Sequence, residues 1–295
     1  MSEPRLRIAV QKSGRLSDDS FALFAGCGLT VSRGRDKLYA RAHGLPIDIL
    51  LVRDDDIPAL VADGAVDLGI VGGNVFEEDL LTVRRPAPAR DLMALGFARC
   101  KLMLAAPKTW SDTALAAFAG KRIATSYPGL TRAFLEREGV EARTVELSGS
   151  IEVAPRLRIA DAVCDIVSTG GTLDANGLEP AATVFESEAH LIARPDPFAP
   201  EVQAIVDAFV KRVRGVIDSR EAKYVMMNAP RGAVDAITEI LPGAEAPTVL
   251  ELAGDPEKVA IHAVCTESVF WTTLERLKAN GASAILVLSI EKMLP

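Results

Sequence analysis

The stretch from Ile47 to Gly73, IDILLVRDDDIPALVADGAVDLGIVGG, contains a complete strand–helix–strand unit. Ile47–Val52 is a short run of branched apolar residues, typical of a buried strand, and Val66–Val71 repeats that pattern. Between them, three aspartates and Pro58 open a helix that ends near Gly64, because acids and proline favour the first turn and glycine favours the end. Alternation with such short loops predicts a largely parallel sheet covered by helices.

The same alternation continues on both sides of this unit. Leu6–Val10 is a predicted strand, and the helix after it begins at Ser17, whose hydroxyl we expect to cap it, and ends at Gly28. The proline-rich segment Arg84–Arg90 is expected to connect two lobes. Beyond it, a second alternating set is predicted, with strands at Leu102–Ala106, Arg122–Thr125 and Cys164–Ser168, a helix at Leu130–Glu138 and a long helix at Glu201–Ser219.

The last 75 residues have a different order of elements. We expect strands at Tyr224–Asn228, Thr248–Leu252, Val259–Val264 and Ile285–Ile290, and helices at Gly232–Leu241 and Ser268–Ala279. The order βαββαβ is that of a ferredoxin-like unit, which hosts many functions and therefore predicts a further domain but no activity.

The composition is that of a folded protein, because 49% of the 295 residues are hydrophobic and charges of both signs are mixed. A net charge of −7 argues against a nucleic-acid binder. No apolar run approaches the roughly 18 residues of a membrane helix, and the first residues lack the apolar segment of a signal peptide. We therefore expect a cytoplasmic protein with neither nucleic-acid nor membrane partners.

Cysteine and histidine form no pattern typical of a metal site or a disulfide framework. The residues are Cys27, Cys100, Cys164 and Cys265, and His43, His190 and His262. Their wide separation predicts free thiols and no catalytic triad built on histidine.

The most informative motif is DIVSTGGT, residues Asp165 to Thr172, in which a strand ends in a turn rich in hydroxyls and glycines. Successive amides around Gly170 and Gly171 can form a concave anion site, and three hydroxyls add donors, as a phosphate monoester requires. The hydroxyls are those of Ser168, Thr169 and Thr172. Asp165 could bind sugar hydroxyls. The alternative is an ordinary turn whose Ser and Thr cap the next helix.

Two further loops follow strands in the first half. Gln11–Arg15 (QKSGR) places Lys12 and Arg15 at the carboxyl end of the first strand, where ligands gather in open α/β sheets. Arg53, followed by three aspartates, could hold pyrophosphate while Asp54 meets Arg or Mg²⁺. The alternative makes the aspartates a cap and first-turn charges of the next helix.

A fourth loop is ATSYPG, Ala124 to Gly129, where Thr125 and Ser126 could contact a ligand or simply cap the following helix. Glu152 lies at another predicted helix start, where favourable interaction with the helix dipole competes with a role in ligand binding.

In this order the motifs resemble ATP phosphoribosyltransferase of histidine biosynthesis, in its long form, over essentially the whole chain. The segments that carry the resemblance are QKSGRL (11–16), VRDDDIP (52–58), VDLGIV (66–71), RIATSYP (122–128), DIVSTGGTL (165–173), SREAKY (219–224), LPGA (241–244) and IEKM (290–293). The last three are similar to the regulatory domain that short forms lack.

The resemblance implies an α/β fold with two periplasmic-binding-protein-like (type II) lobes and an ACT-type βαββαβ domain at the C-terminus. Residues 1–98 with 188–219 would form the first lobe, 99–187 the second, and 220–295 the regulatory domain. It also implies a homohexamer, in possible equilibrium with a dimer, and inhibition by histidine, with AMP as a second possible ligand.

The resemblance assigns the site residues as well. The catalytic residues would be Lys12, Arg15 and Arg53. Phosphoribosyl pyrophosphate (PRPP) would be bound by Asp165, Ser168, Thr169, Gly170, Gly171, Thr172 and Glu152, and ATP or pyrophosphate by Gln11, Gly14, Asp54, Gly72, Thr125, Ser126 and Tyr127. Mg²⁺ would be carried largely by the substrate phosphates, with no metal site of protein side chains. Asn228, Ala229 and Arg231 are the candidate effector contacts.

The chain departs from the family pattern at two positions. Arg158 stands where relatives usually have glycine, in a predicted helix near the sugar-phosphate loop, and Gly73 stands where they often have a charged residue.

The implied reaction is attack of N1 of the ATP adenine on the ribose anomeric carbon of PRPP, giving phosphoribosyl-ATP and pyrophosphate. Because the ring nitrogen attacks with a lone pair, positioning and electrostatic stabilisation should dominate. The residues alone leave two alternative functions open. Prephenate dehydratase also joins such lobes to an ACT domain, and Thr131–Phe134 is faintly similar to its motif. A non-catalytic amino-acid sensor would need no site for a polyphosphate.

Overall fold

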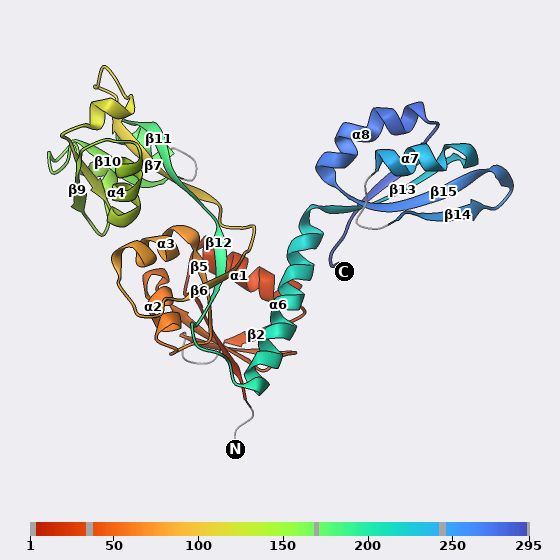
Figure 1. The fold of residues 1–295 in the computed structure, drawn as a ribbon, viewed down its shortest axis with the longest axis horizontal. Coiled ribbons are helices and arrows are strands. Elements are labelled where there is room, and N and C mark those ends of the chain that lie inside the picture. Colours follow the sequence, from red (N-terminus) through yellow and green to blue (C-terminus); the bar gives the residue numbers. More distant parts are fainter. Residues whose placement is uncertain (1–3, 34–37, 168–170, 242–245, 294–295) are drawn as a thin grey trace. The chain divides into compact units, whose positions relative to one another are not determined.

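The computed structural model describes residues 4–33, 38–167, 171–241 and 246–293. The chain divides into two units, Met1–Val206 and Asp207–Pro295, and the boundary falls inside helix α6 (Pro200–Glu221). The first unit contains two lobes with one sheet each, and the second unit contains a third sheet (Figure 1).

The first-lobe sheet has seven strands with a parallel centre. Its spatial order is β2 (Thr30–Arg33), β3 (Tyr39–His43), β4 (Ile47–Val52), β1 (Leu6–Gln11), β5 (Leu68–Gly72), β12 (Ala189–Ala193) and β6 (Arg90–Ala94). Only the pairs β4–β1 and β1–β5 are parallel, and every other neighbouring pair in this sheet is antiparallel. The prediction of a largely parallel sheet is therefore wrong at both edges, because β2–β3 form a hairpin and β12 returns to this sheet from the second lobe.

The second-lobe sheet has the spatial order β11 (Leu178–Ser187), β7 (Cys100–Pro107), β10 (Ala162–Val167), β8 (Arg122–Thr125) and β9 (Arg143–Glu146). Strands β10, β8 and β9 are parallel, whereas β7 and β11 are antiparallel to their neighbours. The chain leaves the first lobe after β6 and returns through β12, so two segments connect the lobes.

The helices of the first unit are α1 (Arg15–Gly26), α2 (Ile57–Ala62), α3 (Gly73–Thr82), α4 (Pro128–Arg137), α5 (Gly171–Ala175) and the first part of α6, with short 3-10 turns η1 (Asp54–Asp56), η2 (Leu115–Phe118) and η3 (Ile151–Val153). Helix α1 begins earlier than predicted. Gly14, with φ of +93°, is its N-cap, and Ser17 is buried inside the helix, so the predicted cap at Ser17 is wrong.

Each lobe has its own apolar core. In the first lobe, Ile57 and Val61 of α2 pack with Val71 of β5 and Phe76 of α3. In the second lobe, Phe118 and Phe134 pack with apolar side chains of β7, β8 and β10. These cores fix the positions of the strand ends from which the polar loops emerge.

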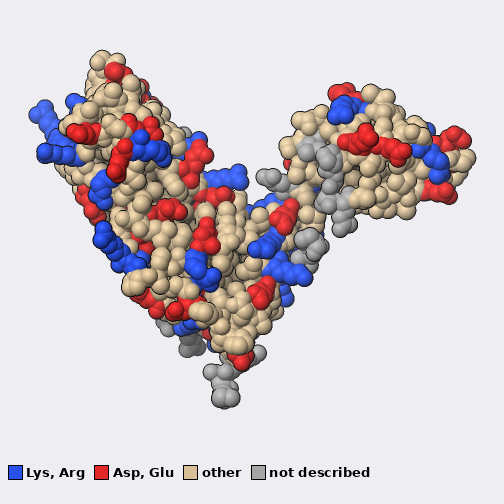
Figure 2. All heavy atoms as spheres, in the orientation of Figure 1, with Lys and Arg blue, Asp and Glu red and all other residues tan. Residues whose placement is uncertain are grey.

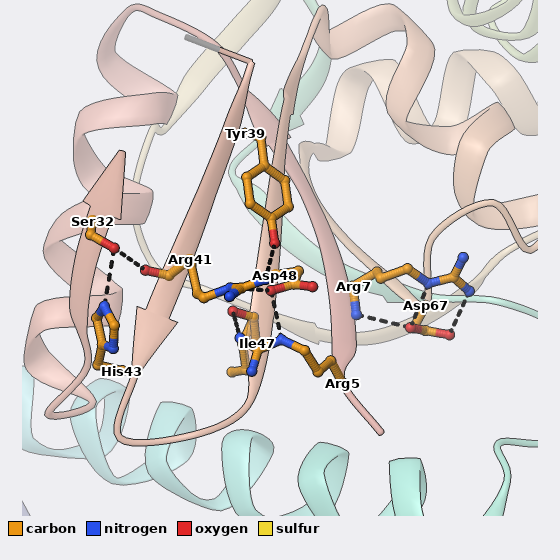
Figure 3. A network of polar contacts seen from close by, with 9 residues as sticks. All are labelled: Arg5, Arg7, Ser32, Tyr39, Arg41, His43, Ile47, Asp48 and Asp67. Atoms are coloured by element: carbon orange, nitrogen blue, oxygen red, sulfur yellow. Dashed lines mark hydrogen bonds and ion pairs between the residues drawn. The ribbon is translucent and has the colours of Figure 1, made fainter. Parts of the chain in front are cut away.

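A polar network joins strands of the first-lobe sheet (Figure 3). The Asp48 carboxylate accepts hydrogen bonds from Arg5 at 2.7 Å and from Arg41 at 3.4 Å. Burial raises the pKa of Asp48, but the bonds from Arg5 and Tyr39 outweigh that effect and hold the pKa below its usual value. The Asp48 carboxylate is therefore ionised in the folded protein at neutral pH.

The second unit has the predicted βαββαβ order, with a sheet in the spatial order β14 (Thr248–Leu252), β15 (Asp255–Thr266), β13 (Ala222–Pro230) and β16 (Ser283–Ser289). All neighbouring strands are antiparallel. The 3-10 turn η4 (Arg231–Ala233), α7 (Val234–Ile240) and α8 (Glu267–Ala279) complete the unit. Its core includes Val225, Met227, Ile237, Ile261 and Leu277.

Among the described residues, no helix is both long and apolar enough to span a membrane. On the face drawn in Figure 2, the described basic and acidic side chains are interspersed and form no continuous basic band of the kind that nucleic acid requires.

Candidate functional site

A cavity of about 960 Å³ lies between the two lobes of the first unit. The first lobe contributes Arg53, Asp54 and Asp55 to its wall, and the second contributes Ser126, Tyr127 and Asp165. These residues lie near the carboxyl ends of β4, β8 and β10. Ligands of open α/β folds bind at that end of the strands, so the cavity is the candidate active site.

Arg53 follows β4 directly and precedes the 3-10 turn η1, so its side chain is exposed on the cavity wall. Lys12 lies beside it, because Gln11 pairs with Val52 and the backbone N–H of Lys12 donates to the Val52 carbonyl at 2.8 Å. Arg15 donates to the carbonyl of Arg99 at 2.8 Å. The residues around the cavity do not include Gln11, Lys12, Gly14, Arg15 or Gly72.

The three aspartates after Arg53 form η1 and leave α2 without a side-chain cap, so the predicted cap is absent. Burial, followed by repulsion from Asp54, raises the pKa of Asp55, and attraction by Arg53 partly offsets this. Both Asp54 and Asp55 face the cavity.

Tyr127 is the most strongly perturbed group of the site. Burial raises its pKa, the Asp54 carboxylate raises it further, and the hydrogen bond from Asn74 at 2.9 Å lowers it. The phenol is therefore neutral at physiological pH. Its oxygen accepts from Asn74, and among the described residues no acceptor takes its hydrogen, which leaves a donor for a ligand.

Thr125 has a structural role. Its side chain is fully buried, and its hydroxyl oxygen accepts the N–H of Tyr127 at 2.9 Å and the hydroxyl of Thr131 at 3.3 Å. It does not line the cavity, so the predicted ligand contact of its side chain is wrong, whereas Ser126 and Tyr127 are on the wall.

Asp165 points toward the cavity from β10, and its carboxylate accepts the N–H of Ile166 at 2.8 Å. Burial raises its pKa, the bond from Ile166 lowers it, and the charge of Glu152 in η3 raises it again. Ser168, Thr169 and Gly170 lie outside the described residues. Gly171 and Thr172 belong to α5.

Asp165→Asn is expected to stabilise the substrate-free protein at neutral pH. A carboxyl whose pKa is raised in the folded state costs stability above that pKa and nothing below the unfolded value of about 3.9. The gain should therefore vanish as the pH falls toward 4, while the asparagine oxygen still accepts from Ile166. Thermal unfolding at pH 7 and at the lowest pH at which the fold survives measures this, and an equal gain at both would contradict the carboxyl as its cause.

Arg158 lies away from the site. It is in the turn before β10, beside Asp161 at the amino end of that strand, whereas Asp165 of the sugar-phosphate motif lies near the carboxyl end. Its predicted place in a helix near that motif is wrong. Its φ is +57°, in the left-handed region where glycine is favoured. Glycine at this position would therefore suit the backbone and would not affect the ligand site.

Arg158→Gly should therefore stabilise the fold by about 0.5–1 kcal/mol. Relief of a left-handed conformation is worth about 1–2 kcal/mol, and the extra freedom of glycine in the unfolded chain removes about 0.5–1 kcal/mol of that. Arg156, in the same turn, has no positive φ, so Arg156→Gly should destabilise by about 0.5–1 kcal/mol. The urea midpoint should rise in Arg158→Gly and fall in Arg156→Gly relative to wild type. A midpoint that falls in both variants contradicts the assignment.

Two residues of α3 that no sequence motif indicates also hold the site together. Glu78 lines the cavity and accepts the backbone N–H groups of Gly129 and Leu130, and Asn74 contacts Tyr127. Gly73, at the start of α3, leaves little room for a side chain, because a Cβ there would approach the His190 ring to 3.1 Å. A glutamate on a helix is normally a surface residue, so only the pairing of α3 with α4 reveals its role.

The candidate effector residues lie in the second unit. The side chain of Ala229 is fully buried in the core, so the predicted effector contact of that side chain is wrong. Arg231 is exposed in η4 and pairs with Glu251 at 3.3 Å. Asn228 is partly exposed in β13.

Comparison with known families gives two matches along the chain. Residues 53–215, more than half of the chain, match the family described as ATP phosphoribosyltransferase. The chain belongs to this family. Residues 219–292 match the C-terminal domain of the same family, which makes it a long-form ATP phosphoribosyltransferase. It is thus a pentosyltransferase of histidine biosynthesis.

One solved structure of the same family agrees with this assignment. The ATP phosphoribosyl transferase (HisG:HisZ) complex from Thermotoga maritima is 26% identical with a TM-score of 0.59, over 72% of this chain and 98% of that one. A putative periplasmic sulfonate-binding protein from Methylobacillus flagellatus KT is 17% identical with a TM-score of 0.49, over 72% of this chain and 67% of that one. The predicted α/β architecture, two lobes with one sheet each and a separate C-terminal domain, is confirmed.

Proposed function

We propose that the cavity between the lobes transfers the phosphoribosyl group of PRPP to N1 of the ATP adenine, releasing pyrophosphate, as the first step of histidine biosynthesis. The observation that carries this is the wall itself. Arg53 from the first lobe faces hydroxyl and carboxylate groups of Ser126, Tyr127 and Asp165 from the second. A cation suits a phosphate chain, and carboxylates and hydroxyls suit sugar hydroxyls and adenine nitrogens.

In this proposal each residue has a separate task. Asp165, with the motif that ends at Thr172, binds the ribose and 5′-phosphate of PRPP. Arg53, with Lys12 beside it at the end of β1, stabilises the charge that develops on the leaving pyrophosphate. The Tyr127 hydroxyl donates a hydrogen bond to ATP. No side chain has to remove a proton from the attacking nitrogen, because N1 attacks with its lone pair.

The described part of the cavity wall carries more carboxylates than cations, although both substrates are polyanions. Mg²⁺ that enters with the substrate phosphates offsets this charge, and carboxylates such as Asp54 offer the hard oxygen ligands it prefers. Among the described residues, no group of three His, Cys, Asp or Glu side chains is placed to hold a metal by itself. The donor set therefore suits an ion delivered with the substrate.

The second unit is the regulatory part of the enzyme in this proposal. Its sheet exposes apolar side chains, among them Leu250 (49%), Leu286 (52%) and Leu288 (52%), and such a surface favours association between copies. Assembly into a homohexamer and inhibition by histidine, with AMP as a competitor, follow from the family membership as proposals. Sedimentation of the intact chain with and without histidine tests the assembly.

The test of the activity mixes the protein with ATP, PRPP and Mg²⁺ in the presence of pyrophosphatase and follows the ultraviolet absorbance of the N1-ribosylated adenine. Pyrophosphatase is needed because the displacement is readily reversible. A rise that histidine suppresses supports the transferase and its regulation. A rise indifferent to histidine removes the regulatory proposal, and no rise with folded protein and verified substrates removes the transferase.

A further inference from the structure

Helix α3 presents three polar side chains, Asn74, Glu78 and Thr82, at intervals of four residues. That spacing places them on one face of the helix. This face meets the start of α4 in the other lobe, and the two helices pack against each other (Figure 1). The contact therefore fixes the part of the cavity wall that directly precedes α4, which consists of Ser126 and Tyr127.

Glu78 takes the central place in this contact. One of its carboxylate oxygens accepts the N–H of Gly129 at 2.7 Å and the other that of Leu130 at 2.8 Å. Pro128 has no N–H, and the N–H of Thr131 donates to the carbonyl of Tyr127 at 3.0 Å. The first turn of α4 lacks a cap from its own N-cap residue, so Glu78 supplies it from the opposite lobe.

Asn74 adds a second link one turn earlier. It is 5% exposed, its amide donates to the Tyr127 hydroxyl at 2.9 Å, and its carbonyl oxygen accepts from Ser187 at 2.8 Å. Ser187 ends β11, where the chain returns to the first lobe, and its hydroxyl also accepts the backbone N–H of Asn74 at 3.0 Å. Tyr127 is thus tied to the connection between the lobes.

The close approach of the two helices depends on Gly129. A Cβ at this position would lie 2.8 Å from the Thr82 methyl carbon and 3.0 Å from both the Glu78 carboxylate and the Leu81 Cβ. A Cβ would therefore force Thr82 to shift and crowd Glu78 and Leu81, so the observed approach of the helices depends on Gly129 having no side chain. The geometry is specific to this pairing of α3 with α4.

We propose that Glu78 is a positioning residue for the transfer reaction. Its carboxylate occupies the free amides of α4 and holds the preceding residues, Ser126 and Tyr127, on the cavity wall. Because these amides are taken, a substrate phosphate does not bind at the start of α4, and the ligand is contacted there by side chains. The inference rests on the proposed function, in which the Tyr127 hydroxyl contacts ATP.

Glu78→Gln tests the role with little change of shape. The glutamine oxygen accepts one amide, but its NH₂ group confronts the other N–H, so one bond is lost. The KM for ATP should rise about tenfold, the equivalent of about 1.4 kcal/mol, while kcat and the KM for PRPP stay within about twofold. Glu78→Asp, which keeps the charge, should recover part of the affinity. Hydrogen exchange at Gly129 and Leu130 should become faster in E78Q.

Glu77 provides the matched control, since it is the neighbouring glutamate on α3 and does not line the cavity. Glu77→Gln should leave both KM values and the exchange at Gly129 and Leu130 unchanged. If the wild type is active and E78Q has the same KM for ATP and the same exchange as E77Q, the role of Glu78 is overturned. An E78Q variant that loses only kcat overturns it as well. A wild-type protein that transfers nothing would instead overturn the proposed function itself.

Discussion

Arg53→Ala is expected to lower kcat/KM for the transfer by about 10²–10³, the usual cost of removing one group that stabilises developing charge. Arg53 is the only cation that the first lobe contributes to the described wall of the cavity. Lys12 lies beside it but outside that wall, so it cannot fully replace the guanidinium. Arg53→Lys should recover part of the loss, because an ammonium keeps the charge but not the two parallel donors of arginine.

Steady-state kinetics with PRPP varied, together with equilibrium binding of PRPP, measures this effect. Arg156→Ala is the control, since Arg156 is exposed in the second lobe and does not line the cavity. A loss of PRPP binding in the Arg53 variant also separates the transferase from an amino-acid sensor, which would keep its amino acid. An Arg53→Ala enzyme within a few-fold of wild type would falsify the assignment.

The parts of the fold that sequence predicts best are those governed by local patterns. Arg122–Thr125 forms a strand with the predicted bounds, and the order of elements in the last 75 residues is as predicted. Strands β2 and β3 were missed, because their sequences TVSR and YARAH contain few large apolar residues. Their stability comes from the pairing of β2 with β3 and of β3 with β4, which no local pattern contains.

For the candidate site too, local patterns predict the position of a residue in the chain but not the direction of its side chain. Arg53, Ser126 and Tyr127 follow strands and Asp165 lies near the carboxyl end of one, which is where the general rule expects ligands to bind. Thr125 has the same location in sequence, yet its hydroxyl is used inside the lobe. Whether a side chain at a strand end points outward or inward depends on the twist and packing of the sheet, which the motif does not specify.

Long-range polar pairs were beyond the sequence altogether. Glu78 and Asn74 act on residues about fifty positions away, and their shared face on α3 is visible only once α4 is known to lie opposite. Asp67 is a similar case, since it follows Val66 in a predicted strand and gave no indication of its partners.

Asp67→Ala is expected to have the largest effect on stability, about 3 kcal/mol. The carboxylate is only 5% exposed and accepts the backbone N–H of Arg7 at 2.9 Å and its guanidinium at 3.3 Å (Figure 3). Arg194 lies 3.8 Å away, and its buried Nε has no hydrogen-bond partner among the described residues. Without the Asp67 carboxylate, the backbone N–H of Arg7 loses its acceptor. The guanidinium groups of Arg7 and Arg194 also lose the carboxylate beside them.

The magnitude follows from those losses. Breaking a buried ion pair costs about 3–5 kcal/mol, and the half-exposed Arg7 side chain moves the expectation to the lower end of that range. For a unit of this size, about 3 kcal/mol lowers Tm by roughly 6–12 °C. Asp67→Asn, whose oxygen can still accept the Arg7 N–H, should lose less. Asp63→Ala, at the exposed end of α2, should stay within about 0.5 kcal/mol. Calorimetry of the intact chain compares the three, and an Asp67 variant no less stable than the Asp63 variant would mean that the carboxylate contributes nothing to joining β1 and β5.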